Sequence, residues 1–207
     1  MTAAMRLADQ QGLSAVSLRN VAAALQAGPM RLYGYVATKE ELLELMVDAV
    51  WGELDGAFRG GWREVLSEIA ERLRATHRKH PWFVSLLGGR PSFGPHVLAH
   101  REAAFAALSE SPGFADIDLV LQAYRTLLSY VIGALQSEDH ELRAERESGL
   151  AESEWQAAMW PYMRRTIATG RYPALARVVS EASHPPAEAL FQLGLEMVLD
   201  GIAAHIR

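Results

Sequence analysis

The amino-acid sequence predicts an all-α protein in which an N-terminal helix-turn-helix domain is followed by a larger helical domain. Apolar residues recur at spacings of three and four along most of the chain, which is the period of a helix. No segment alternates apolar and polar residues over the length of a strand, and glycine or proline separates the helical stretches. We expect residues 1–45 to form the first domain and residues 46–207 the second.

The segment 17–43 has the pattern of two short helices joined by a tight turn. Ser17 can cap the first helix, because a serine hydroxyl can accept a backbone N–H of the first turn. Leu18, Val21, Ala22 and Leu25 recur at helical spacing and form the one apolar face of this helix. The pattern stops at Gln26-Ala27-Gly28, where we expect the glycine to shape the turn because glycine tolerates positive φ.

Pro29 opens the second helix of this segment, at a position where its missing N–H costs nothing. Leu32 and Val36 are four residues apart and face inward together. Two short, tightly joined helices with arginine and tyrosine exposed on the second suit insertion into the major groove of DNA. The side chains expected to point outward are Met30, Arg31, Tyr33 and Tyr35.

Beyond this segment the pattern predicts helices at residues 39–53, 62–79, 82–87, 96–108, 117–137, 152–169 and 186–206. Asp116 or Asp118 can cap the helix at 117–137. The charged stretch 137–152 is expected to be a mobile connection or a polar extension of that helix. The helices at 117–137 and 186–206 are apolar on several faces, so most of their circumference must be covered.

Composition and charge favour a cytoplasmic protein with a basic N-terminal end. The chain has no cysteine and no N-terminal signal pattern, and Gln122 and Arg125 interrupt its most apolar stretch, so we expect no membrane span. Residues 1–39 carry three arginines and one lysine against one aspartate, a net charge of +3 in a chain whose net charge is −5. This asymmetry is typical of a protein whose basic end meets DNA.

The segment Leu32-Tyr33-x-Tyr35-Val36-x-x-Lys39-x-x-Leu42-Leu43 resembles the DNA-reading part of TetR-type transcriptional repressors. The usual family form is Leu-Tyr-x-His-Val or Leu-Tyr-x-His-Phe, followed by a lysine and a Leu-Leu pair, and the likeness extends over residues 4–54. Gln26 replaces the turn glycine of most members, and Tyr35 replaces their histidine, although a tyrosine hydroxyl can still donate to a phosphate oxygen. Most members carry a basic arm and a fuller first helix ahead of this point, so an earlier start of the natural chain is expected.

The resemblance implies a set of DNA contacts. Arg31 is the best placed to bind a guanine edge through two hydrogen bonds. Tyr33 and Lys39 match phosphate contacts of the family, and Met30 is a candidate for contact with a thymine methyl group. The full set of expected DNA-binding residues is Ser17, Leu18, Arg19, Pro29, Met30, Arg31, Tyr33, Tyr35 and Lys39.

In the second domain, the segments Leu-Leu-Gly-Gly-Arg-Pro at 86–91, Gly-Arg-Tyr-Pro at 170–173 and the final stretch 191–206 resemble the regulatory domain of tetracycline-repressor-like members. The resemblance implies that the helices at 117–137 and 186–206 form a four-helix bundle with a second copy of the chain, where Gly133, Gly194 and Gly201 permit close backbone approach. The alternative is that both helices are simply central in a monomer.

An effector pocket is expected among the aromatic and methionine side chains of this domain, apolar with a few polar anchors. The alternative is an ordinary hydrophobic core. The expected lining is Trp82, Phe83, Phe93, His96, Phe105, Gln122, Tyr124, Arg125, Trp155 and Met159.

No metal or cofactor is expected at this pocket. His96 and His100 are four residues apart on one predicted helix, which suits a metal pair, but the sequence offers no third ligand. Tetracycline-binding members place a histidine directly before a Leu-Gly-x-Arg-Pro segment to hold the magnesium ion of the drug. This chain has Leu86 at that position, which argues against a tetracycline–magnesium effector.

The sequence thus predicts a homodimeric repressor that binds a palindromic operator through residues 1–45. A small apolar or amphipathic effector, bound within residues 46–207, would release the DNA. No catalytic triad, phosphate-binding glycine loop or paired acid motif supports an enzyme. The alternative is an all-α ligand-binding or enzymatic protein whose N-terminal domain no longer binds DNA, because Gln26 and Tyr35 depart from the family pattern.

Overall fold

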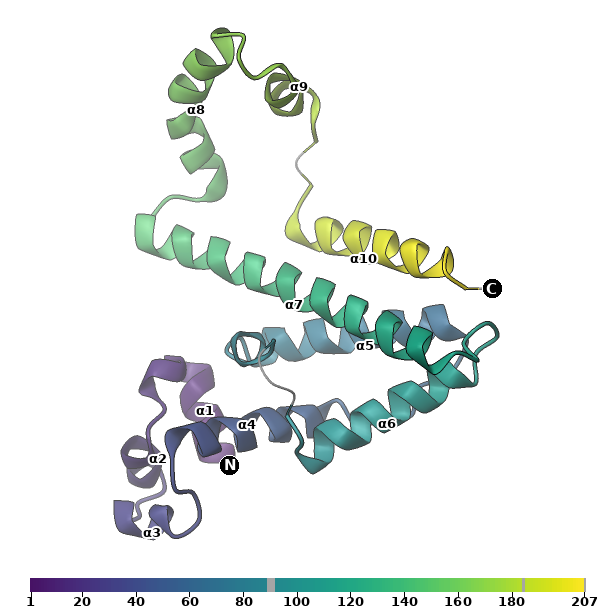
Figure 1. Ribbon diagram of the computed structural model, residues 1–207. Helices are drawn as coiled ribbons and strands as arrows, with labels where there is room; N and C mark the ends of the chain where they lie inside the picture. The colour runs from purple at the N-terminus through teal and green to yellow at the C-terminus, as the bar shows by residue number, and fades with distance from the viewer. Residues whose placement is uncertain (89–91, 184, 207) are drawn as a thin grey trace. The chain divides into compact units, whose positions relative to one another are not determined.

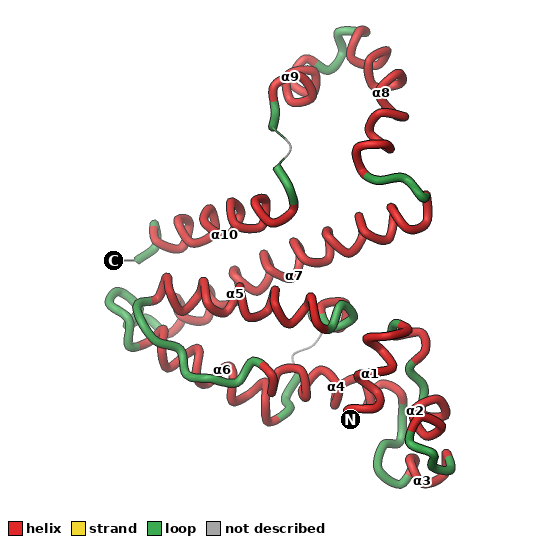
Figure 2. The backbone as a smooth tube through the Cα atoms, turned by 180° about the vertical axis from the view of Figure 1, so that it is seen from behind, coloured by secondary structure: helices red, strands yellow, loops and turns green. Residues whose placement is uncertain are grey.

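The computed structural model describes residues 1–88, 92–183 and 185–206, and its helices confirm the all-α prediction (Figure 1). No strand occurs among these residues, as the uniformly helical and looped trace in Figure 2 shows. The helices are α1 (Thr2–Gln11), α2 (Leu18–Ala24), α3 (Pro29–Tyr33), α4 (Lys39–Glu53), α5 (Trp62–Lys79), α6 (Pro95–Ser109), α7 (Ile117–Ser148), α8 (Glu152–Ala168), α9 (Pro173–Glu181) and α10 (Ala187–Ala203), with short 3₁₀ turns η1 (Leu13–Ala15) and η2 (Val84–Leu86).

The chain folds into two compact units. The first unit comprises Met1–Gln136 and Gly194–Arg207, which carry α1 to α6, most of α7 and the end of α10. Within it α2 packs on α1 and α3, and α6 packs on both α4 and α5. The second unit comprises Ser137–Leu193, where α8 packs on α9. We call the three helices α1 to α3 the head.

The apolar stripe predicted for α5 forms part of the core of the first unit. Val65, Leu66, Ile69 and Ala70 are fully buried, at the spacing that one helix face requires. Each large aliphatic side chain that leaves water in this way contributes about 1.5–3 kcal/mol. The α5 helix is therefore a central support of the unit that carries the head.

The charged stretch after residue 137 extends α7 as a helix. The helix has 32 residues, which corresponds to a length of about 48 Å. Of the two predicted caps, Asp116 performs the role, because its Oδ1 accepts the backbone N–H of Asp118 at 2.9 Å. No helix is predicted between residues 169 and 186, but Pro173 begins the nine-residue helix α9 there. Proline is well suited to such a first position.

The turn between α2 and α3 corrects the predicted role of Gly28. Gly28 has an ordinary extended conformation, with φ −67° and ψ 139°. Gln26 instead adopts the left-handed conformation, with φ 54°, as the one described non-glycine residue of positive φ. The position that carries glycine in most TetR-type sequences thus keeps a glycine-like backbone here with a side chain in place. The side chain costs about 1–2 kcal/mol in this conformation.

We expect Gln26→Gly to raise the free energy of unfolding by about 0.5–1 kcal/mol, because relief of left-handed strain exceeds the entropy that glycine loses on folding. Urea denaturation at fixed pH measures this difference. Gly28→Ala is the matched control and should be neutral within about 0.5 kcal/mol, since a Cβ there meets no atom within 4 Å. A destabilised Gly28→Ala protein beside an unaffected Gln26→Gly protein would contradict this account of the turn.

Candidate DNA-binding surface and regulatory core

The α2 helix begins as the sequence predicts. The Ser17 hydroxyl accepts the backbone N–H of Asn20 at 3.1 Å, and the Asn20 side chain donates to the Ala15 carbonyl at 2.8 Å. Leu18, Val21 and Ala22 are buried, as the predicted apolar face requires. Leu25 departs from that prediction, because it lies just beyond the last residue of α2 and is 51% exposed. These contacts orient α2 so that α3 is held on the surface of the head.

The α3 helix presents large side chains to solvent. Met30 is 82% exposed, Tyr35, just beyond the helix end, is 76% exposed and Tyr33 is 51% exposed. Arg31 is exposed beside them, and Val36 is buried, as its predicted inward position requires. So many exposed apolar and aromatic groups on so small a domain are typical of a binding surface.

Two cations border this surface. Arg19 is exposed near the start of α2, and Lys39 is exposed as the first residue of α4. The start of α4 is fixed by Thr38, whose hydroxyl accepts the backbone N–H of Glu41 at 3.1 Å. Glu41 in turn accepts the backbone N–H of Ala37 at 2.7 Å. Lys39, one of the expected phosphate contacts, therefore lies on a capped helix end.

The structure does not bring all nine expected DNA-binding residues to this surface. Leu18 lies in the apolar interior of the head, because it begins the buried stripe of α2. The side chain of Pro29 lies outside the described part of the structure. The exposed members of the set are Arg19, Met30, Arg31, Tyr33, Tyr35 and Lys39.

In the regulatory part, a buried histidine lies in a group of aromatic rings. His100 on α6 is 3% exposed, and neither of its ring nitrogens has a hydrogen-bond partner among the described residues. Its ring centroid lies 4.7 Å from that of Trp51 and 5.5 Å from that of Phe58. Burial, with a further contribution from the nearby Arg72 cation, lowers the pKa of His100 to about 4. The imidazole is therefore neutral near pH 7.

A tyrosine completes this group. The Tyr124 ring on α7 lies 6.5 Å from the His100 ring and 5.1 Å from that of Phe105, measured between centroids. Burial raises the pKa of Tyr124 to about 12, although the adjacent Arg101 acts in the opposite direction. The hydroxyl is thus a neutral group in apolar surroundings. We call Trp51, Phe58, His100, Phe105 and Tyr124 the aromatic group.

Of the ten residues expected to line an effector pocket, the structure brings Phe105 and Tyr124 into this aromatic group. Trp82 and Phe83 are buried close by, with Phe83 5.7 Å from the Trp51 ring centroid. The other six lie elsewhere. Phe93 and Arg125 are exposed, and Trp155 and Met159 are exposed on α8 of the second unit. His96 is half-exposed and lies 3.6 Å from Asp55. Gln122 lines the groove between α7 and α10 that is described below.

From its spacing, His100 is a candidate only for a metal pair with His96. In the structure the two histidines have different surroundings, because His96 faces Asp55 while His100 lies among aromatic rings. No group of three or more possible ligand side chains occurs in the part of the chain that the structure describes. The apolar neighbours of His100 come from α4 and the loop after it, which helical spacing within α6 alone does not reveal.

A buried carboxylate ties α4 to the start of α6. Asp48 is 7% exposed, and its Oδ1 accepts the backbone N–H groups of His96 and Val97, both at 3.1 Å. A Cβ added at Gly94 would overlap this carboxylate. The helix that leads out of the head is therefore held directly on the helix that carries His100.

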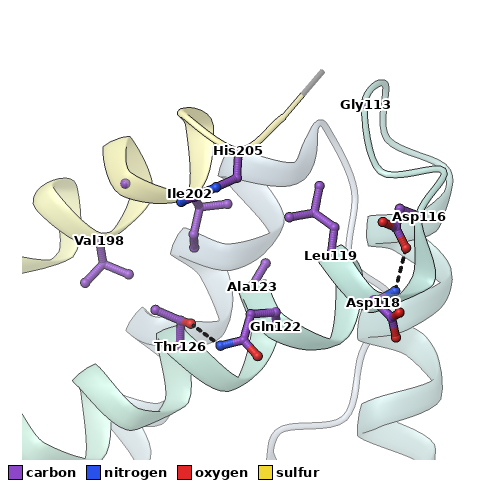
Figure 3. Close-up of a pocket in the computed structure, with 11 residues that line it drawn as sticks. Gly113, Asp116, Asp118, Leu119, Gln122, Ala123, Thr126, Val198, Ile202 and His205 are labelled. Carbon is purple, nitrogen blue, oxygen red and sulfur yellow. Dashed lines mark hydrogen bonds between the residues drawn. The ribbon is translucent and has the colours of Figure 1, made fainter.

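An open groove lies between α7 and the end of α10 (Figure 3). It has a volume of about 730 Å³ and is lined by side chains such as Leu119, Gln122, Val198 and Ile202. Gln122 donates to the Thr126 hydroxyl at 3.4 Å along its floor. A Cβ added at Gly201, which also lines the groove, would meet no atom within 4 Å, whereas a Cβ at Gly194 would overlap the Tyr130 ring of the same chain. Close approach at Gly194 is therefore an intrachain contact.

A head of this form, with an exposed arginine and tyrosines on its second helix-turn-helix helix, followed by a helical regulatory domain, defines a class of DNA-binding transcriptional regulators. Family comparison agrees over nearly the whole chain. Residues 1–46 match the model of the bacterial regulatory proteins of the TetR family, and residues 57–206 match the tetracycline-repressor-like C-terminal domain. The chain belongs to the TetR family of transcriptional repressors.

Individual relatives support this assignment. The chain is similar to the HTH-type transcriptional repressor DrrR1 of Streptomyces coeruleorubidus, with 37% identity over 97% of this chain and 74% of that protein. It is 35% identical to an HTH-type transcriptional regulator of Saccharopolyspora erythraea, over 99% of this chain and 83% of that protein. Among solved structures, ActR of Streptomyces coelicolor in complex with actinorhodin matches with a TM-score of 0.80 and 25% identity, over 98% of this chain and 94% of that one.

The family is one of regulators and not of enzymes, so the enzymatic alternative has no support from relatives. No described helix is both long and apolar enough to cross a membrane. Residues 89–91, which belong to the Leu-Gly-x-Arg-Pro resemblance, lie outside the described residues.

Proposed function

We propose that this repressor acts in the cytoplasm as a homodimer that binds a two-fold symmetric operator and leaves it when a small effector binds. The proposal rests on the exposure of large side chains on and just beyond α3. Met30 and Tyr35 are among the most exposed large side chains described, and they flank an arginine. Folding alone gives no reason for this exposure, whereas insertion into a major groove does.

In this proposal Arg31 reads a base and the residues around it hold the DNA backbone. An arginine guanidinium can donate two hydrogen bonds to the O6 and N7 atoms of guanine. Tyr33, Tyr35 and Lys39 are exposed at the margins of α3 and the start of α4, where a hydroxyl or ammonium group can donate to phosphate oxygens. Lysine and arginine also release condensed counterions, so binding should weaken as salt rises.

Dimerisation through α7 and α10 is supported by apolar groups that one copy of the first unit leaves exposed. Ile117 and Leu121 of α7 are 64% and 42% exposed, and Met197 of α10 is 65% exposed. A second copy related by a two-fold axis would cover these side chains and would place two heads on one side of the DNA.

Selection of bound sequences from a random double-stranded DNA library tests the DNA-binding role. We expect enrichment of an inverted repeat, because a two-fold dimer reads two equal half-sites. A gel-shift with the enriched sequence should show one protein dimer per site and a clear loss of binding on raising salt. Absence of any enriched sequence would favour the alternative that the head no longer binds DNA.

The aromatic group supports a particular kind of effector. Its polar atoms, at His100 and Tyr124, are neutral and buried, and those of His100 have no partner of their own. Buried polar groups without partners are costly, so a ligand that supplies hydrogen bonds there is stabilised by satisfying them. We infer an uncharged, flat aromatic effector that carries hydroxyl or carbonyl groups.

Effector binding of this kind should not need a divalent metal. A thermal-shift screen of hydroxylated aromatic compounds, run with and without EDTA, should give the same hits in both conditions, and hits should release operator DNA in a gel-shift. His100→Leu should abolish the thermal shifts, while the matched control His140→Leu, at an exposed position on α7, should keep them. Hits that vanish with EDTA, or that persist in His100→Leu, would contradict the proposed anchor.

His100→Leu should also raise the free energy of unfolding of the ligand-free protein by about 1–2 kcal/mol, because leucine removes two buried polar atoms without partners. It should also reduce acid sensitivity. The folded-state pKa of His100 lies near 4, below its unfolded value of 6.5, so the unfolded chain takes up a proton first as pH falls. The natural protein therefore loses stability between pH 6.5 and about 4, and His100→Leu should lose less over that interval. Urea denaturation at several pH values measures both effects.

A further inference from the structure

A polar cluster joins the head to the regulatory helices. It consists of Asp9 on α1, Glu53 at the end of α4, Lys79 at the end of α5, and His80 and Trp82 directly after α5; we call it the junction cluster. Asp9 Oδ1 lies 2.7 Å from His80 Nδ1 and 2.7 Å from Trp82 Nε1. The two ring-bearing residues are buried, at 3% and 5% exposure.

Chemistry fixes the direction of these hydrogen bonds. An indole N–H can only donate and an ionised carboxylate can only accept, so Trp82 donates to Asp9. On the other side of the His80 ring, Nε2 lies 3.3 Å from Glu53 Oε2, the oxygen that also binds the Lys79 ammonium group. Both ring nitrogens of His80 therefore face carboxylate oxygens. Only the protonated imidazole can donate to both of them.

The position of the cluster suggests what these bonds control. Asp9 belongs to the head but lies on α1, whereas the expected DNA contacts lie on α2, α3 and the start of α4. Its partners His80 and Trp82 lie more than seventy residues further along the chain, in the regulatory part. A dimer can fill both half-sites only when its two heads are held at the right spacing. Heads that are already fixed lose less conformational freedom on binding.

We propose that the junction cluster fixes the head on the regulatory helices in its operator-binding position, with Asp9, His80 and Trp82 as positioning residues for DNA binding. The proposal rests on the operator binding proposed above. The charged groups that face the His80 ring are Asp9 from α1 and Glu53 from α4, with Lys79 bound to Glu53. Removal of either hydrogen bond to Asp9 frees the head from the regulatory helices and therefore lowers operator affinity.

The first test measures operator affinity of the full chain by fluorescence anisotropy, with the DNA sequence recovered by selection. Asp9→Asn and Trp82→Phe should each lower affinity about tenfold, the loss typical of one hydrogen bond to a charged group. Glu102→Gln, at an exposed acid on α6, is the matched control. Removal of a negative charge by itself strengthens attraction to DNA, so charge alone would make Asp9→Asn bind the operator more tightly. A loss of affinity in this variant therefore reports the lost hydrogen bond and not the changed charge. Affinity equal to that of the control would overturn the proposal.

Hydrogen exchange of α1 in the DNA-free protein separates this proposal from operator binding itself. In the Asp9→Asn and Trp82→Phe proteins, the amide hydrogens of α1 should exchange faster than in the natural protein, while those of α5 and α6 should stay protected. Unchanged exchange in α1 would overturn the positioning role even where affinity falls. If the natural protein selects no DNA sequence, the proposed operator binding fails, and the exchange measurement still decides whether the cluster holds the head.

Discussion

Replacing Arg31 with alanine should lower specific operator affinity about 5- to 150-fold, equivalent to about 1–3 kcal/mol. The side chain is exposed on α3 between Met30 and Tyr33, so the substitution removes no core packing, and the loss reports a contact with DNA. Because a bidentate arginine discriminates guanine from other bases, the preference for one base pair in each half-site should relax as well. Anisotropy titrations against the selected operator and its single-base variants measure both effects.

The matched control for this experiment is Arg6→Ala, which removes the same charge from an exposed position on α1. This variant should weaken binding to all sequences slightly and equally, because it changes only the general attraction to phosphates. Tyr33→Phe and Lys39→Ala should behave in the same sequence-independent way, with a larger loss. An Arg31→Ala protein that keeps both its affinity and its base preference would show that α3 does not read bases through this residue.

Replacing Met197 with glutamate should convert the proposed dimer into a folded monomer and remove most operator affinity. The side chain is 65% exposed in one chain, so glutamate there is harmless to the monomer but would carry an unpaired charge into an apolar interface. That cost is several kcal/mol per subunit, enough to raise the dissociation constant of the dimer more than about a hundredfold. Sedimentation measures the association state, and circular dichroism checks that the helices remain.

Two comparisons sharpen this test. Val178→Glu places the same charge at a 57% exposed apolar position on α9, outside the proposed interface, and should leave the dimer intact. Leu199→Glu should instead unfold the chain, because Leu199 is fully buried within one copy. A Met197→Glu protein that sediments as a dimer would place the interface elsewhere.

The sequence predicts most of the fold because helix boundaries depend on local chemistry. Lys39–Glu53 and Trp62–Lys79 coincide with the predicted segments, since a capping threonine, glycines and a closing His-Pro pair mark their ends. The cap at Ser17 and the apolar face of α2 follow from the same local rules. The turn differs because Gln26, and not Gly28, adopts the left-handed conformation, so the glycine in the sequence does not mark the residue of positive φ.

The exposure of the α3 side chains could be predicted from the sequence and the grouping of side chains in the regulatory core could not, for a physical reason. Exposed residues on α3 are recognised from one short helix and its spacing. The aromatic group instead combines Trp51 from α4, Phe58 from the following loop, His100 from α6 and Tyr124 from α7. Such a group depends on packing between segments that are distant in the sequence. Aromatic residue type alone does not separate buried residues of this kind from exposed ones such as Phe93.

The bond between Asp48 and the start of α6 limits how this chain can diverge. The carboxylate occupies the space that a side chain at position 94 would need, so the two sites cannot be altered independently. Among homologues, a glycine at the position of Gly94 should occur together with an acidic or amide residue at the position of Asp48. Where a larger residue replaces the glycine, a small residue should replace the acid, and another group must then supply the N-terminal cap of α6. Paired change at these two positions would mark the lineages in which the connection between head and regulatory domain has been rebuilt.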